Sequence, residues 1–309
     1  RTEELKKMEI HTLRYFLDTA REENMSKAAE RLHVSQSTLS KQMKRLEEEL
    51  GKKLFIRHSF SIELTEEGML LRKRAEDLLS LADKIEEEFS AMDDIVGGNI
   101  YFGCAESWQI RHLAGAIREF KKRYPDFHYH ITSGDTEQVA EKLDRGLLDF
   151  AVIVEEPDYG KYEALKMPEA DRWGLVMPSG CSLAQKEQIE FGDLTGLPLF
   201  CSEQGWRNDI PKWCGRGIEK LTLEGSFRLS YNGSVFAREG LGYLLTFDRL
   251  VNTGPESGLA FRPLYPPLET EMFIIWRKRQ VFTPIAERFI SELRKRLERP
   301  EWEEKPISL

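Results

Sequence analysis

Short polar side chains and basic side chains lie close together in the run Ser35 to Leu50, SQSTLSKQMKRLEEEL. Short hydrogen-bonding side chains in the first turns of a helix can approach base edges in a DNA major groove. Lysine and arginine further along a helix suit phosphate contacts, which hold register without reading sequence. The candidate DNA-contacting residues of this run are Gln36, Ser37, Thr38, Ser40, Lys41, Lys44 and Arg45.

The apolar positions of the same run indicate the helix that must present those side chains. Apolar residues at helical spacing are expected to pack on the body of a small domain. That inward face is predicted to contain Val34, Leu39, Met43, Leu46 and Leu50. Ser35 is a good N-cap, and Gly51 stands where a glycine commonly ends a helix.

A shorter helix and a two-stranded wing flank this helix. The helix Ser26 to Leu32 is predicted to begin with Ser26 as its N-cap, and small residues at Ala28 and Ala29 let two helices cross closely. The wing is LFIRHSFSIELT, with Arg57 on its near strand and His58 at its tip. The order predicts a winged helix-turn-helix, and Ser26, Arg57 and His58 join the candidate DNA contacts.

Charge is divided unevenly along the chain. Residues 1–58 carry 13 Lys and Arg against 10 Asp and Glu, although the whole chain has a net charge of -8. The sequence therefore has a modestly basic head on an acidic body, which is the asymmetry expected where only the head meets nucleic acid.

The run Leu13 to Gly68 resembles the head of LysR-type transcriptional regulators. The matching pieces are LRYF, SKAAERLHVSQSTLSKQMKRLEEELGKKLFIRH and, after the wing, LTEEG. Two positions depart from the family pattern: Glu67 stands where alanine is usual, and Thr38 where alanine or proline is frequent. The resemblance implies sequence-specific binding of double-stranded DNA, and the Thr38 difference bears on which bases are read.

A long amphipathic helix is predicted from its cap Thr65 to about Asp93. Its apolar residues alternate by four and three positions and form a heptad seam. The seam comprises Leu71, Ala75, Leu78, Ala82, Ile85, Phe89 and Met92, of which Leu71, Leu78, Ile85 and Phe89 are the candidate dimerisation residues. One helix cannot bury such a seam alone, so a second chain is expected; packing against its own domain is the alternative. LysR-type proteins dimerise through this element.

The remainder of the chain alternates between strand-like and helical stretches. Strands are predicted at 99–103, 127–133, 150–154, 173–177, 199–201, 227–230, 243–246, 259–263 and 271–276, and helices at 109–123, 136–146 and 283–297. The opening βαβαβ order predicts a mostly parallel sheet covered by helices on both faces.

This pattern is similar to the effector-binding domain of LysR-type regulators, which resembles periplasmic binding proteins. The local matches are GNIYFG, GLLDFAVI and EGLGYLLTF. The domains implied are a winged head at 8–64, a linker helix at 65–95 and an α/β effector domain at 97–300. Lobe I of that domain would span about 97–165 and 268–300, and lobe II about 166–267.

A small-molecule effector is expected beyond the carboxyl ends of the strands, near helix N-termini. The preferred effector contacts are Ser107, Thr136, Ser202 and Asn232, each of which could instead be a simple helix cap. Glu106 opposes an anionic effector, so it either points away or selects a cationic or polar ligand. Trp206, Trp213 and Phe236 are aromatic candidates for the cleft, although core packing explains them too.

Several other classes of protein fit the sequence less well. Phosphate-loop, nucleophile-elbow and zinc-protease motifs do not occur, so no catalytic residues, cofactor or metal site are predicted. An α/β enzyme or metabolite-binding module with an added helical head is the alternative. Cys201 and Cys214 are the pair to watch for a redox role. No apolar run suits a membrane span or a signal peptide, so a cytoplasmic location and no membrane contact are expected.

The expected assembly is a homodimer that pairs into a homotetramer on an interrupted palindrome, with RNA polymerase as a possible partner. Effector binding is expected to change the angle between lobes and so the spacing of the heads. The sequence leaves open the effector, the regulated genes, and whether the protein activates or represses.

Overall fold

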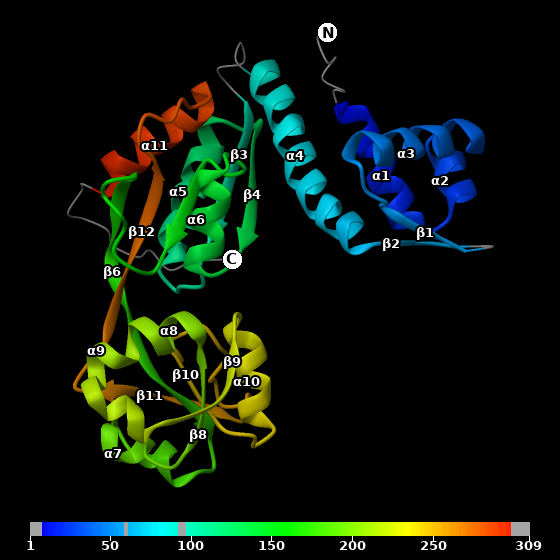
Figure 1. Ribbon diagram of the computed structural model, residues 1–309. Coiled ribbons are helices and arrows are strands. Elements are labelled where there is room, and N and C mark those ends of the chain that lie inside the picture. The colour runs from blue at the N-terminus through cyan, green and yellow to red at the C-terminus, as the bar shows by residue number, and fades with distance from the viewer. Residues whose placement is uncertain (1–7, 59–60, 92–96, 298–309) are drawn as a thin grey trace. The chain divides into compact units, whose positions relative to one another are not determined.

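The computed structural model describes residues 8–58, 61–91 and 97–297. Contacts within the chain divide it into two compact units, residues 1–89 and 90–309. Figure 1 labels the helices and strands of each unit.

Three helices and a short hairpin form the head of the first unit. The helices are α1 (Ile10–Glu22), α2 (Met25–Arg31) and α3 (Gln36–Leu50), and the hairpin pairs β1 (Phe55–Arg57) with β2 (Ile62–Leu64). Their core contains Leu13, Phe16, Leu39, Met43 and Leu46, each 1% exposed or less. The predicted helix-turn-helix and wing are confirmed.

Two local predictions in the head need correction. Ser26 lies inside α2, because the side chain of Asn24 caps this helix by accepting from the Ser26 and Lys27 N–H groups. An asparagine placed before the first turn competes successfully with the serine that follows it. Leu50 was expected to pack inward, but it is 41% exposed in the last turn of α3, next to the left-handed Gly51.

The long helix α4 (Glu66–Ala91) follows the wing. Thr65 caps it as predicted, since the Thr65 hydroxyl accepts from the Gly68 N–H at 3.0 Å. Gly68 lies so close to the wing that an added Cβ would stand 2.3 Å from the carbonyl oxygen of Leu54. Glycine is therefore required where the first turn of α4 lies against the residue before β1. Met92 and the predicted end of the helix lie outside the described residues.

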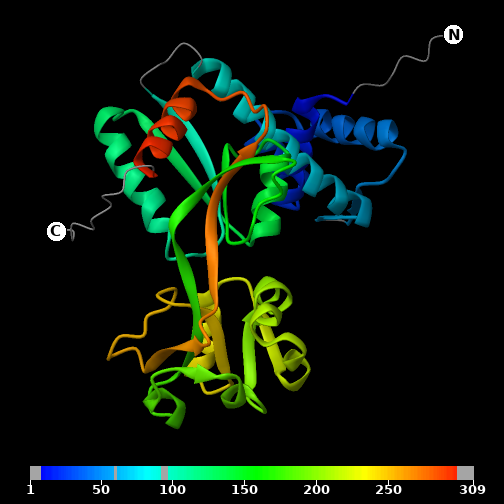
Figure 2. The ribbon, with the colours of Figure 1, turned by 90° about the vertical axis from the view of Figure 1, so that its left-hand side faces the viewer.

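The second unit contains one long curved sheet with helices on its faces (Figure 2). The strand order is β4-β3-β5-β12-β6-β10-β8-β9, with β11 pairing β6 and β7. Lobe I, as the structure has it, contains β3 (Gly98–Cys104), α5 (Ile110–Arg123), β4 (Phe127–Ser133), α6 (Thr136–Asp144), β5 (Phe150–Ile153) and α11 (Pro284–Leu297). Its strands β4, β3 and β5 are parallel, as the βαβαβ pattern predicted.

Lobe II contains the remaining elements apart from the crossing strands. They are two 3-10 helices, Ser182–Gln185 and Gly215–Lys220, with β7 (Ile189–Glu190), α7 (Phe191–Leu194), β8 (Pro198–Ser202), α8 (Glu203–Asn208), α9 (Ile210–Cys214), β9 (Thr222–Phe227), α10 (Ser230–Arg238), β10 (Tyr243–Phe247) and β11 (Leu259–Tyr265). The strand predicted at 227–230 is wrong: β9 ends at Phe227 and Ser230 already begins α10.

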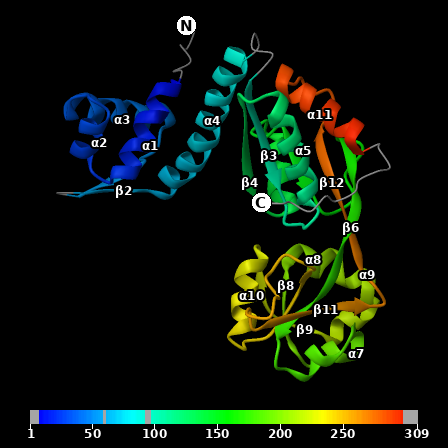
Figure 3. The same cartoon turned by 180° about the vertical axis from the view of Figure 1, so that it is seen from behind.

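Two long strands join the lobes (Figure 3). They are β6 (Tyr162–Pro178) and β12 (Glu269–Arg277), which pair antiparallel with a register shift between Glu271 and Phe273. Beyond its pairing with β12, β6 continues into lobe II and pairs with β10 and β11. The crossing is thus a continuous hydrogen-bonded ribbon.

Candidate nucleic-acid interface and effector cleft

The solvent face of α3 carries the polar side chains that the sequence singled out. Leu39, Met43 and Leu46 point into the core and are fully buried. Ser40 is half-buried, and its hydroxyl accepts from the Arg57 guanidinium of the wing at 3.3 Å. The other candidates are exposed, namely Gln36, Ser37, Thr38, Lys41, Lys44 and Arg45.

Hydroxyl groups organise the N-terminal turn of α3. The Ser35 hydroxyl accepts from the Thr38 N–H at 3.1 Å, which caps the helix as predicted. It also lies 2.9 Å from the Ser37 hydroxyl and 2.7 Å from the Thr38 hydroxyl. These exposed hydroxyls are fixed in position before any ligand arrives, which lowers the entropy lost on binding.

The basic residues further along α3 already face carboxylates on the next turn. The Arg45 Nε donates to Glu49 at 2.8 Å, and the Lys44 ammonium lies 3.9 Å from Glu48. Both basic side chains are more than half exposed, so these pairs add little stability and can exchange for a phosphate.

The wing is fastened to α3 by a buried carboxylate. Glu47 is 5% exposed, and its Oε1 accepts from the N–H groups of Leu54 at 2.9 Å and Phe55 at 3.3 Å. Its other oxygen lies 3.1 Å from the Lys53 ammonium. Burial alone raises the pKa of Glu47, but these donors outweigh burial and hold the pKa below its ordinary value. At the wing, Arg57 and His58 are exposed, and His58 lies 3.6 Å from Glu63.

The predicted seam of α4 divides into two parts. Leu71 and the buried Ala75 pack on the core of the head. Leu78, Ile85 and Phe89 are instead 39%, 45% and 68% exposed. Exposed apolar side chains of this size in a row mark an interaction surface. The part that packs on the head corresponds to the alternative considered for the whole seam.

A cavity of about 70 Å³ lies in the second unit, between residues of lobe I and lobe II. Ala105, Glu106, Gly134, Asp135 and Val154 line it from lobe I. Lobe II and the β6 strand contribute Trp173, Ser202, Glu203, Gln204, Gly205, Asp209, Phe227, Arg228, Ser230, Leu245, Thr246, Phe247 and Leu250. The cavity lies at the carboxyl ends of β3, β5 and β8, where ligands of open α/β sheets bind.

Direct contacts join the two lobes around this cavity. The Ser230 N–H donates to the Glu106 carboxylate at 2.6 Å, and the Gln204 amide donates to the Thr136 hydroxyl at 3.1 Å. The guanidinium of Arg228 lies 3.9 Å from Asp135. Polar contacts across the cavity therefore hold this arrangement of the two lobes.

Comparison with protein families decides what the two units are. The family described as "LysR substrate binding domain" matches residues 95–298, and the family described as "Bacterial regulatory helix-turn-helix protein, lysR family" matches residues 10–69. The chain belongs to the LysR family. It is a DNA-binding transcriptional regulator whose C-terminal α/β domain binds a small-molecule effector, as the sequence predicted.

Curated relatives of this LysR-type protein include regulators named IlvY. The HTH-type transcriptional regulator IlvY of Escherichia coli (strain K12) is 28% identical over 211 residues, covering 68% of this chain and 71% of the relative. The HTH-type transcriptional activator IlvY of Haemophilus influenzae is 27% identical over 288 residues, covering 91% of this chain and 98% of the relative.

Solved structures of the family share the fold of this chain. Full-length CbnR complexed with its target DNA superposes with a TM-score of 0.72 at 23% identity, covering 93% of this chain and 99% of that chain. At this identity the likeness shows the fold, namely helix-turn-helix helices followed by an α/β domain like a periplasmic binding protein.

The four predicted effector contacts occupy different places in this LysR-type fold. Ser202 lines the cavity and caps α8 by accepting from the Gly205 N–H at 3.1 Å. Thr136 lies beside the cavity, bonded to Gln204. Ser107 does not line it and donates to Asp171 instead. Asn232 is exposed in the first turn of α10, away from the lining.

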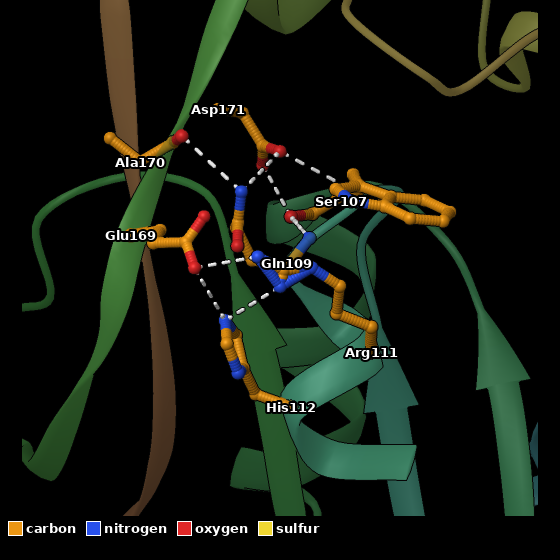
Figure 4. Close-up of polar contacts among 8 residues, drawn as sticks. Ser107, Gln109, Arg111, His112, Glu169, Ala170 and Asp171 are labelled. Atoms are coloured by element: carbon orange, nitrogen blue, oxygen red, sulfur yellow. Dashed lines mark hydrogen bonds and ion pairs between the residues drawn. The ribbon is translucent and has the colours of Figure 1, made fainter. Parts of the chain in front are cut away.

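A polar cluster ties the start of α5 to the crossing strand β6 (Figure 4). Besides the Ser107 hydroxyl, the Trp108 N–H donates to Asp171, at 3.2 Å, and the Gln109 amide donates to the Ala170 carbonyl at 3.3 Å. Burial raises the pKa of Asp171 to about 6, although these donors oppose the rise. The cluster fixes the loop that carries Glu106 to the ribbon between the lobes.

The opposite side of that cluster contains a buried histidine. His112 is fully buried, and its Nε2 lies 3.1 Å from the Arg111 guanidinium and 3.7 Å from Glu169. The Arg111 guanidinium donates to Glu169 at 2.6 Å, which holds the pKa of that carboxyl below its ordinary value. These groups anchor α5 and do not line the cavity.

Sequence reasoning missed several residues of the cavity wall. Gln204 belongs to the short helix α8, Asp209 lies between α8 and α9, and Arg228 lies in the connection where a strand was predicted. The sequence marks Gln204 and Arg228 only as polar residues close to a strand end, where other polar residues were the preferred candidates. Trp206, Trp213 and Phe236 do not line the cavity. Cys201 is fully buried, which raises the pKa of its thiol well above the ordinary value and disfavours the reactive thiolate.

The described residues contain neither a membrane-spanning helix nor a cluster of metal-binding side chains. The helices in the described parts are too short or too polar to span a membrane. Within the same residues, His, Cys, Asp and Glu side chains do not gather in groups that could hold a metal ion.

Proposed function

We propose that α3 enters the DNA major groove with Gln36, Ser37 and Thr38 toward base edges. Lys41, Lys44 and Arg45 lie further along the same face, where they suit phosphates, and Arg57 and His58 extend this surface onto the wing. Ser26 and Ser40 complete the proposed DNA contacts. The observation that carries the proposal is the capped, solvent-exposed polar turn of α3 opposite its fully buried apolar face.

The exposed row on α4 supports dimerisation. Leu78, Ile85 and Phe89 are apolar, large and exposed on one helix, and a second copy would remove them from water. We propose that Leu71 borders this contact from the head side. Two heads in one dimer bind two half-sites, and pairing of dimers into a tetramer fits an interrupted palindrome.

The cavity between the lobes is the proposed effector site, with Ser202 as a contact. Ser107, Thr136 and Asn232 are proposed to act around it rather than in its wall. An effector regulates only if it binds one lobe arrangement better than another. RNA polymerase is a proposed partner at the promoter, and the cytoplasm is the proposed location.

A gel-shift titration tests the proposed function. Purified full-length protein is mixed with the DNA flanking its own gene and with a scrambled duplex at equal ionic strength, with and without metabolites. The proposal expects tighter binding to the native flank, by a factor on the order of 1000. Equal affinity for both duplexes in every mixture contradicts it.

A further inference from the structure

The N-terminus of α10 has no cap from its own sequence. Its N-cap residue is Leu229, whose side chain cannot accept a hydrogen bond and makes none with the first N–H groups of the helix. A helix start with free N–H groups attracts anions. In an effector cleft such a place suits the carboxylate of a ligand.

A carboxylate of the chain itself takes that place. Glu106 comes from the end of β3 in lobe I, 124 residues away in sequence, and accepts from the Ser230 N–H at 2.6 Å. Both residues line the cavity. The contact is charge-assisted, which makes it stronger than one between neutral groups.

The mounting of Glu106 is rigid on both sides. The N–H of Ala105 donates to the Val152 carbonyl at 3.0 Å, and Ser107 donates to the buried Asp171 on β6. The backbone that carries Glu106 is therefore fixed on both sides, at a place from which its carboxylate reaches the start of α10.

The single guanidinium of the described cavity wall is also occupied. Arg228 lies 3.9 Å from Asp135, which at the same time caps α6 by accepting from the Gln138 N–H. Beyond Glu106 and Asp135, the lining contains the carboxyl groups of Glu203 and Asp209. An anion that enters meets carboxylates, and both Arg228 and the Ser230 N–H already face carboxylates of the chain.

The rest of the wall suits an organic cation. The aromatic rings of Trp173, Phe227 and Phe247 line the cavity together with those carboxyl groups. An alkylammonium group is attracted by carboxylates and by the faces of aromatic rings, most strongly where water is excluded.

We propose that Glu106 is a built-in carboxylate ligand of the α10 N-terminus and that it makes the cavity select an effector with an ammonium group over a carboxylate. The inference rests on the proposed effector site. It makes Glu106 the residue that sets the charge of the effector.

Two probes of similar size and opposite charge test the proposal: propylammonium chloride and sodium propionate. The thermal unfolding midpoint of the full-length protein is titrated with each, against sodium chloride at equal ionic strength. The wild-type protein is expected to show a saturable rise with propylammonium and the sodium chloride response with propionate. Glu106→Ala empties the carboxylate place, so its affinity for propionate is expected to exceed that of wild type by about ten-fold.

Two further variants make the result specific. Glu187→Ala removes an exposed glutamate of lobe II that does not line the cavity, and it is expected to behave as wild type. Glu106→Gln keeps the length of the side chain but removes its charge, so it is expected to lose the propylammonium response. It serves where Glu106→Ala fails to fold.

The outcomes that overturn the proposal are equally definite. Stabilisation of wild type by propionate, or equal propionate affinity in wild type and Glu106→Ala, contradicts the proposal that Glu106 is a built-in ligand of the α10 N-terminus. If the wild-type protein responds to neither probe, the proposed preference of the cavity for an ammonium group is wrong. These measurements contain no DNA, so a failed gel shift on its own promoter leaves them standing, and their failure leaves the gel shift standing.

Discussion

The surface of α3 and the cavity of the second unit use polar side chains in opposite ways. On α3 the polar groups are exposed and are organised by neighbours three or four residues away, as for Ser35 with Thr38 and Arg45 with Glu49. Around the cavity the partners are far apart in sequence, by 124 residues for Glu106 with Ser230 and 68 for Thr136 with Gln204. Substitutions at the exposed positions of α3 are therefore expected to change binding without changing stability. Substitutions at the buried positions are expected to change both.

The exposed apolar row of α4 gives the largest expected effect without loss of the fold. The double substitution Ile85→Asp and Phe89→Asp places charge where a partner helix is expected. Burial of two such side chains is worth about 3–6 kcal/mol, so the dimer is expected to weaken by more than about 100-fold. Sedimentation velocity measures this, with Met69→Asp as a control on an exposed residue of the same helix outside the proposed dimerisation residues. Unchanged assembly rejects the proposed contact.

Glu47 is buried, unlike the exposed polar residues of α3, and its substitution is expected to give the next largest effect. Glu47→Ala leaves the N–H groups of Leu54 and Phe55 without their acceptor, and the free energy of unfolding is expected to fall by about 2–4 kcal/mol. The neighbouring exposed Glu48→Ala is expected to change it by less than about 0.5 kcal/mol. Urea denaturation and hydrogen exchange at Leu54 and Phe55 measure both. Equal effects of the two substitutions would show that the buried Glu47 stabilises the head no more than the exposed Glu48.

The stabilisation that Glu47 provides is expected to depend on pH. Its pKa in the folded head is lowered, so its stabilisation is complete above the ordinary value of 4.5 and is lost as the pH falls through the lower folded value. The difference in stability between wild type and Glu47→Ala is therefore expected to shrink below that pH.

Asp171 is expected to respond to pH in the opposite direction. Its folded pKa is raised from 3.8 to about 6, so its favourable contribution is complete below pH 3.8 and is lost as the pH rises to about 6. Relative to Asp171→Asn, wild type is expected to lose on the order of 2 kcal/mol of unfolding free energy across that window. Chemical denaturation of both proteins at pH 4 and pH 7 measures the difference; a constant difference contradicts the buried carboxyl.

The exposed residues of α3 are expected to give the smallest effect on stability. Gln36→Ala is expected to alter sequence preference, whereas Lys44→Ala is expected to weaken all duplexes alike and to lower the salt dependence by about one ion. Unfolding midpoints should remain close to wild type. Binding across a salt series measures both, with the exposed Lys122→Ala of the second unit as control. An unchanged salt slope in Lys44→Ala refutes the phosphate contact.

The sequence predicted what depends on near neighbours. The caps Ser35 and Thr65 and the buried face of α3 follow from three- and four-residue spacings, and the structure has them. The order of lobe I strands and the family also followed. Ser26 failed as a cap because α2 already begins at Met25, where the Asn24 side chain accepts from the Ser26 and Lys27 N–H groups.

What remained out of reach depends on distant partners. Ser107 follows a strand end, as a ligand contact should, but its hydroxyl donates to Asp171, 64 residues away. Gln204 meets Thr136 across 68 residues. A local pattern marks such side chains as polar near a strand end, and only the folded sheet decides which of them face the cavity.

The ribbon of β6 and β12 has a mechanical consequence. Two hydrogen-bonded strands resist stretching and sliding, because either movement breaks the ladder between them, yet such a pair can twist and bend. The irregular step between Glu271 and Phe273 is the place where the ladder is weakest. A rearrangement that a ligand causes is therefore expected to twist or bend this ribbon rather than stretch it, with Met272 at the irregular step.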